Sequence, residues 1–184
     1  MRNNPFLYAL VGAMVFSTAI FVVEASAVDY TVVAFGDSTT VSDSRVPVTY
    51  ADILRNELPR YDIGGTVSNK GAGSNTTEYA SARFNEDVLA QNPDLVFLQF
   101  GINDSAVDVW KDPPVKQPRV SLEQYVKNLK HVIETLRKSN TAVILMTPNP
   151  LRWTPELKGM YGKPPYDPDE AGLLVESVDV SIQP

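Results

Sequence analysis

The stretch YTVVAFGDS, Tyr30–Ser38, decides the fold, because an apolar run is followed at once by a tight turn that carries a hydroxyl group. The run Tyr30–Phe35 is rich in β-branched and aromatic residues and stops at Gly36, a composition typical of a buried strand. A Gly-Asp turn at the carboxyl end of such a strand can lift Ser38 into the crevice where open α/β folds bind their ligands, although an isolated Gly-Asp-Ser is more often a plain turn. Ser38 is therefore a candidate nucleophile.

Strand-like and helical stretches alternate beyond this turn. Further strands are predicted at Thr66–Ser68, Asp94–Phe100 and Ala142–Met146, the last as a buried strand. Their alternation with helices implies parallel strands joined by crossover helices and covered on both faces. The sequence therefore predicts the α/β class.

Helices are predicted over Thr49–Leu58, from Asn75 to about Gln91, and from Ser121 onward. Asn75 stands as an N-cap with Glu78 at its capping-box position, and Gln124 completes a second box after Ser121. Apolar residues at helical spacing form one face of this last helix: Leu122, Tyr125, Leu129, Ile133 and Leu136.

Residues 1–27 have the three-part form of a secretory signal peptide. Arg2 precedes the apolar run Phe6–Val23, and Ala25–Ala27 offers small residues for cleavage. We predict cleavage after Ala27, a secreted or periplasmic location, and one domain over residues 28–184. The alternative is an uncleaved membrane anchor, since about 18 apolar residues approach spanning length.

Composition excludes several function classes. The chain has no cysteine, so disulfides cannot stabilise it, and a net charge of −6 argues against nucleic-acid binding. The lysine and arginine positions are scattered and predict a solvated surface. From about residue 148 a proline-rich tail excludes both a long helix and a central strand.

Two further segments follow predicted strands and supply hydrogen-bond donors. The loop Asn69–Thr77 turns sharply before a helix N-terminus, so a backbone amide of Gly73 or Ser74 can face an oxyanion. The segment Gly101–Asp104 follows the strand Asp94–Phe100 and can present the Asn103 amide to the same crevice. Taken singly, each segment is equally a plain turn or a helix cap.

In this order the three segments resemble the SGNH hydrolases, also called GDSL-type esterases and lipases, from about Tyr30 through Pro150. The first block is Gly36-Asp37-Ser38, the second Asn69–Thr77 and the third Gly101–Asp104. The resemblance implies a flavodoxin-like three-layer sandwich with a parallel sheet. It also implies hydrolysis of acyl esters, with an acetyl group on a carbohydrate as one candidate, and no cofactor.

Residue roles follow from the same resemblance. Ser38 would attack the ester carbonyl, while the Asn103 side chain and the amides of Ser38 and of Gly73 or Ser74 would hold the oxyanion. The family usually has glycine where Ser74 stands. The supporting motif positions are Gly36, Asp37, Asn69, Gly71, Gly101 and Asp104.

The family also has a C-terminal Asp-x-x-His block that supplies the general base, and this sequence has none. Its one histidine, His131, is predicted to point to solvent from the middle of a helix, opposite the apolar face. We therefore expect a C-terminally incomplete hydrolase, and loss of the base lowers turnover by on the order of 10⁶. The alternative function is a catalytically inactive remnant that binds a ligand.

Other residues bear on partners. Asp37 and Asp104 flank the site, but without a histidine cluster they do not predict a metal. Four aromatic residues either line a sugar-binding surface or pack a proline-rich loop against the body: Trp110, Trp153, Tyr161 and Tyr166. The expected partner is a small-molecule or carbohydrate ester, with membrane contact only through an uncleaved signal segment.

Overall fold

The computed structural model describes residues 29–43 and 46–166, so the predicted signal peptide and the end of the tail lie outside the described residues. In chain order the elements are β1 (Asp29–Gly36), α1 (Tyr50–Glu57), the 3₁₀ turn η1 (Leu58–Tyr61), β2 (Gly64–Gly71), α2 (Thr77–Asp87), the 3₁₀ turn η2 (Leu89–Gln91), β3 (Leu95–Gln99), α3 (Ile102–Ser105), α4 (Leu122–Lys138), β4 (Ala142–Leu145) and α5 (Pro155–Tyr161).

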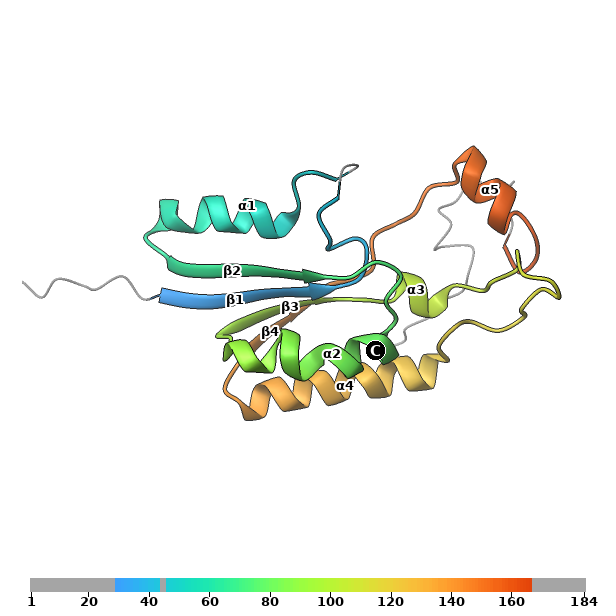
Figure 1. Cartoon of the computed structure of the whole chain (residues 1–184). Coiled ribbons are helices and arrows are strands. Elements are labelled where there is room, and N and C mark those ends of the chain that lie inside the picture. Colours follow the sequence, from blue (N-terminus) through green and yellow to red (C-terminus); the bar gives the residue numbers. More distant parts are fainter. Residues whose placement is uncertain (1–28, 44–45, 167–184) are drawn as a thin grey trace, which may run out of the picture.

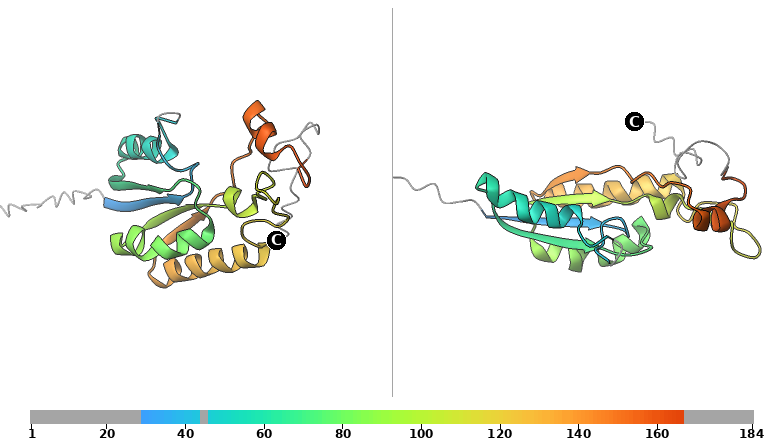
Figure 2. Two further views of the ribbon diagram at one scale, coloured as in Figure 1. Left: turned by 45° about the vertical axis from the view of Figure 1, so that its right-hand side comes forward. Right: turned by 90° about the horizontal axis from the view of Figure 1, so that it is seen from above.

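The four described strands form one parallel sheet in the order β2-β1-β3-β4. Helix α1 covers one face and helices α2 and α4 cover the other, while α3 and α5 lie beyond the carboxyl ends of the strands (Figures 1 and 2). The α/β fold with a parallel sheet in three layers is confirmed. The strand order reverses between β1 and β3, and ligands of open α/β sheets bind outside such a switch point.

Alternating side chains of β1 supply both cores. Val33 and Phe35 belong to the core beneath α2 and α4, whereas Val32 and Ala34 pack toward α1. Phe35 is fully buried, with its ring 5.3 Å from that of Phe100 and 6.1 Å from that of Phe84, centroid to centroid. Because successive side chains of β1 point to opposite faces of the sheet, this strand packs against the helices on both sides and joins the three layers.

Two predicted burials are wrong. Strand β4 is an edge strand, and Ile144 and Leu145 are 44% and 52% exposed, because α1 is the one described helix on its face of the sheet and packs on β2. Leu122 is exposed as well, since it lies in the first turn of α4. The rest of the predicted apolar face of α4 is buried or half-buried.

The helix starts agree with the sequence in part. Thr49 caps α1 in a full capping box with Asp52, and the Ser121 hydroxyl accepts from the Gln124 amide of α4. The Gln124 side chain donates to Asn128, so only half of the predicted second box forms. Helix α2 begins one residue later than predicted, with Thr76 rather than Asn75 as its N-cap.

Within residues 29–43 and 46–166, none of the helices has the length and apolar character that a membrane span requires.

Phe35 tests the central position of β1. We expect Phe35→Ala to lower the free energy of unfolding by about 3–5 kcal/mol, because it removes a fully buried ring between two phenylalanines. Tyr30→Ala, on the same strand but 41% exposed, is the control and should cost about 1 kcal/mol or less. Chemical denaturation measures both, and equal losses would contradict this account of the core.

Candidate active site

The three sequence blocks begin at one level of the sheet. In the ladder, Gly36 at the end of β1 pairs with Gly71 on one side and with Gln99 on the other. Because the strands are parallel, the residues that follow all emerge at the same carboxyl edge, on both sides of the switch point. The first block thus lies between the second and the third.

A buried carboxylate holds the turn that bears Ser38. Asp37 is 1% exposed, and its Oδ1 accepts from the Thr39 amide at 2.9 Å and from the Thr39 hydroxyl at 2.8 Å. Burial raises the pKa of Asp37, and these hydrogen bonds oppose the rise. Ser38 itself is exposed, and its hydroxyl has no hydrogen-bond partner among the described residues. The turn therefore presents the hydroxyl outward.

The second block is bonded to the first along its length. The Asn69 side chain donates to the Thr40 carbonyl at 2.7 Å and accepts from the Gly71 amide at 2.9 Å. A Cβ at Gly71 would lie 2.3 Å from the backbone nitrogen of Val41, so only glycine lets the two segments approach this closely. Beyond Gly71, the Ala72 amide donates to the Gly36 carbonyl at 3.1 Å.

Ser74 occupies a backbone conformation that favours glycine. Its φ is +59°, in the left-handed region, where an L-residue costs about 1–2 kcal/mol. The preceding residue Gly73 is exposed, and a Cβ built on it meets no atom within 4 Å. The backbone of this turn explains why a glycine suits position 74, and the amides of both residues lie on an exposed turn.

The third block depends on Gly101, whose φ is +136°. A Cβ there would lie 2.7 Å from Cγ of Pro148 and 3.2 Å from the Tyr125 hydroxyl, so this turn into α3 needs glycine. Two residues on, the Asn103 side-chain amide donates to the Asn75 carbonyl at 3.1 Å. The amide carries a second N–H, which this bond leaves available.

Asp104 joins the third block to the start of α2. Its Oδ1 accepts from the amide of Thr77 at 2.9 Å and from the Thr77 hydroxyl at 2.5 Å. A carboxylate is favoured at a helix N-terminus, so Asp104 serves where a local cap was predicted, and this corrects the assignment of Asn75. Its Oδ2 is buried without a described partner, and burial raises the pKa of Asp104.

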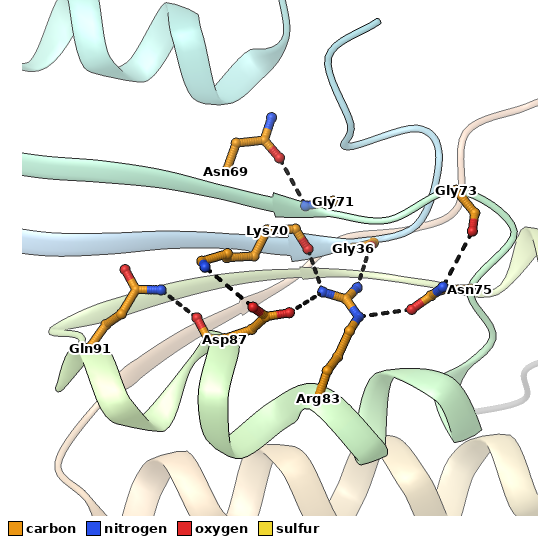
Figure 3. Close-up of polar contacts among 9 residues, drawn as sticks. All are labelled: Gly36, Asn69, Lys70, Gly71, Gly73, Asn75, Arg83, Asp87 and Gln91. Atoms are coloured by element: carbon orange, nitrogen blue, oxygen red, sulfur yellow. Dashed lines mark hydrogen bonds and ion pairs between the residues drawn. The ribbon is translucent and has the colours of Figure 1, made fainter.

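Arg83 of α2 braces the first two blocks from below, as Figure 3 shows. Its guanidinium donates to the carbonyls of Gly36 at 2.9 Å and Lys70 at 2.8 Å and to Oδ1 of Asn75 at 2.8 Å. Asp87, one turn along the helix, accepts from it at 2.7 Å. The guanidinium also lies 4.5 Å from the centroid of the Phe35 ring.

This bracing corrects the prediction that the basic residues form a solvated surface. The Arg83 side chain is 20% exposed and that of Arg119 is 27% exposed, and both are bonded to site residues. Sequence reasoning missed them because their bonds to Gly36 and Asn103 span 47 and 16 positions of the chain. The spacing of Arg83 and Asp87 at i,i+4 was the available signal, but it is equally typical of a surface pair.

The remaining candidates form no hydrogen bond with the three blocks among the described residues. His131 is exposed in the middle of α4. The described residues contain no group of three or more histidine, aspartate or glutamate side chains that could hold a metal ion. Trp153, Tyr161 and Tyr166 pack edge to face in a small cluster over Val107 and Val109, which is the packing alternative. Trp110 is 45% exposed.

Comparison with known proteins points to one family. Residues 34–172 match the GDSL-like lipase/acylhydrolase family. The chain is 39% identical over 123 residues to the uncharacterized lipoprotein YqeF of Bacillus subtilis, a match that covers 65% of this chain and 49% of that protein. It is 38% identical over 90 residues to an acetylxylan esterase of Geobacillus stearothermophilus, covering 47% of this chain and 39% of that enzyme.

Comparison with solved structures also finds an acetylxylan esterase. An acetylxylan esterase from Geobacillus stearothermophilus superposes with a TM-score of 0.57 at 27% identity, covering 70% of this chain and 64% of that one. Variants of it described as catalytic mutants replace a serine, an aspartate or a histidine by alanine. The chain therefore spans less than two thirds of the length of each of these three relatives.

The Ser74 turn gives a first prediction for the site. We expect Ser74→Gly to raise the free energy of unfolding by about 1 kcal/mol, because glycine relieves the left-handed conformation. Gly73→Ala is the matched control one position earlier, and it should change that energy by less than about 1 kcal/mol. Urea denaturation compares the variants, and a loss of stability in Ser74→Gly would contradict the assignment of strain.

Asp104 and Asp52 should give opposite pH dependences. The pKa of Asp104 is raised above 3.8, so the folded state binds its proton at a pH where the unfolded chain does not. As the pH falls from 7 toward 4, the wild type should therefore gain stability relative to Asp104→Asn.

Hydrogen bonds from the Thr49 amide and hydroxyl lower the pKa of Asp52 to about 2. Relative to Asp52→Asn, the wild type should lose stability as the pH falls from 4 toward 2.

Denaturation curves recorded across this pH range measure both differences. Parallel stability profiles for the wild type and Asp104→Asn would show that this carboxyl titrates alike in the folded and unfolded states, contrary to its burial.

Proposed function

The chain belongs to the GDSL-like lipase/acylhydrolase family, the SGNH hydrolases, and from this premise we propose that it hydrolyses esters through an acyl-serine intermediate on Ser38. One observation carries the proposal. The exposed Ser38 leaves the sheet at the level from which the segments with Ser74 and Asn103 also leave, and hydrogen bonds join the three segments. Nucleophile and oxyanion donors thus come from three adjacent chain segments at one edge.

In the proposed reaction the Ser38 oxygen attacks the carbonyl carbon of the ester, and its proton passes to a base. The negative charge that develops on the carbonyl oxygen is held by the free N–H of Asn103 and by backbone amides of Ser38 and of Gly73 or Ser74. Collapse of the tetrahedral intermediate releases the alcohol, which takes up a proton. Water then attacks the acyl-serine, releases the carboxylic acid and returns the proton to Ser38.

An acetyl group on a carbohydrate is the substrate class we propose. Similarity to an acetylxylan esterase supports it. The test is release of acetate from acetylated xylan, compared with hydrolysis of p-nitrophenyl octanoate. A higher kcat/KM for the long acyl chain would contradict an acetyl preference.

We also propose that the protein is exported. The three-part leader in the sequence supports this, and so does the similarity to a lipoprotein of Bacillus subtilis. Fractionation of cells that express the full chain tests it, with cytoplasmic retention as the contrary result.

A second candidate function is ligand binding without turnover. It is favoured by the position of the chain's one histidine, because His131 is exposed in the middle of α4, outside the three blocks. The described residues thus bring no imidazole to Ser38. The two functions share the nucleophile and the oxyanion donors and differ in the source of the base.

Turnover of phenyl acetate by the full chain separates these functions. We expect Ser38→Ala to abolish the enzyme-dependent rate and Asn103→Ala to lower kcat by about 10²–10³, because each removes a group proposed to act at the reacting carbonyl. Asn56→Ala, an exposed asparagine on α1, is the matched control and should leave the rate unchanged.

Equal rates for the wild type and Ser38→Ala would contradict the esterase proposal for this chain. Added imidazole then tests the second candidate. Turnover that depends on both Ser38 and imidazole would mean that the nucleophile and the oxyanion donors are intact and only the base is lacking.

A further inference from the structure

The segment between α3 and α4 returns to the site where it began. Val107 and Pro118 form an isolated antiparallel bridge, and the Arg119 amide donates to the Ala106 carbonyl at 3.0 Å. The amide of Val120 donates to the Asp104 carbonyl at 3.0 Å. The proline-containing excursion is therefore closed at its base, and its last residues lie beside the third block.

Asp108 fixes the Arg119 side chain at this closure. The Asp108 side chain is 6% exposed, and its Oδ1 accepts from Nη2 of Arg119 at 2.7 Å and from Nε at 3.0 Å. Its Oδ2 lies 2.8 Å from Nζ of Lys111. Burial acts to raise the pKa of Asp108, but the hydrogen bonds from Arg119 and Lys111 lower it below its ordinary value. Arg119 is thus held by a carboxylate that stays ionised.

The third nitrogen of Arg119 reaches the oxyanion donor itself. Nη1 donates to Oδ1 of Asn103 at 3.2 Å, while Nδ2 of Asn103 donates to the Asn75 carbonyl at 3.1 Å. Both ends of the amide are therefore fixed. Rotation of the amide by 180° would place its NH₂ group against the Arg119 guanidinium and its oxygen against the Asn75 carbonyl, so neither hydrogen bond could form. A cation at the amide oxygen also polarises the remaining N–H toward the crevice.

We propose that Arg119 is a positioning residue that holds the Asn103 amide with its free N–H directed at the oxyanion. The inference rests on the proposed esterase function and extends its site to the loop after α3. It accounts for an arginine here, because a planar fork can bind Asp108 with two nitrogens and Asn103 with the third, whereas the point charge of a lysine cannot.

A purely structural role for Arg119 in closing the loop makes a different prediction, and Lys111 provides the control. Both cations bind Asp108, but Lys111 has no contact with Asn103 among the described residues. If Arg119 only braces the loop, its loss should lower kcat by the same factor whether or not the Asn103 side chain is present. If Arg119 positions Asn103, its loss should lower kcat only when that side chain is present.

The experiment is a double-mutant cycle on the full chain with phenyl acetate. Arg119→Lys keeps the ion pair with Asp108, and we expect it to lower kcat about 10-fold to 10²-fold with KM little changed. In the Asn103→Ala background the same substitution should have no further effect. Lys111→Met should leave kcat unchanged. Equal losses from Arg119→Lys in both backgrounds would overturn the proposal.

The wild type and Ser38→Ala could hydrolyse phenyl acetate at the same rate, and that result would count against the esterase function alone. The positioning role of Arg119 is then tested by NMR. The side-chain NH₂ signals of Asn103 in a ¹⁵N-labelled sample are assigned by their loss in Asn103→Ala. Arg119→Lys should shift them and speed their exchange with solvent, whereas Lys111→Met should not. Signals that are unchanged in Arg119→Lys would overturn the positioning role.

Discussion

The carbonyl of Gly36, the last of β1, accepts hydrogen bonds from the Ala72 amide and from the Arg83 guanidinium. The bonded ladder of β1 ends here, and the turn that carries Ser38 leaves the sheet at this point. The two donors come from the second block and from α2, so the end of β1 is tied to both its neighbours. Without them the turn would be held by the contacts of Asp37 with Thr39 and Thr40, by two bonds to Gln99 and by the bond from Asn69 to the Thr40 carbonyl.

The strands and their ends could be predicted from the sequence because they follow from local composition. Tyr30–Phe35 and Asp94–Phe100 are β-branched and aromatic runs closed by glycine, and β1 and β3 lie there in the structure. The exposure of β4 could not be predicted in this way. An apolar run indicates a strand, but its composition does not say whether a layer covers it.

The bonds that join the three blocks to one another could not be predicted, because each joins residues far apart in the chain. Arg83 reaches Gly36 across 47 positions, and Asp104 caps the helix of Thr77 across 27 positions. The local capping signature at Asn75 was outweighed by this distant carboxylate. Asn75 was thereby left to bond Arg83 and Gly73, which is a role that no short pattern encodes.

The two arginines connect through that same asparagine. Arg119 donates to the Asn103 oxygen, the Asn103 nitrogen donates to the Asn75 carbonyl, and the Asn75 side chain accepts from Arg83. Arg83 closes the series at the Gly36 carbonyl, two residues before Ser38. An unbroken series of hydrogen bonds therefore runs from the loop after α3 to the turn that carries Ser38. Because it joins all three blocks, the distance between Ser38 and the proposed oxyanion donors is set by side chains as well as by the sheet.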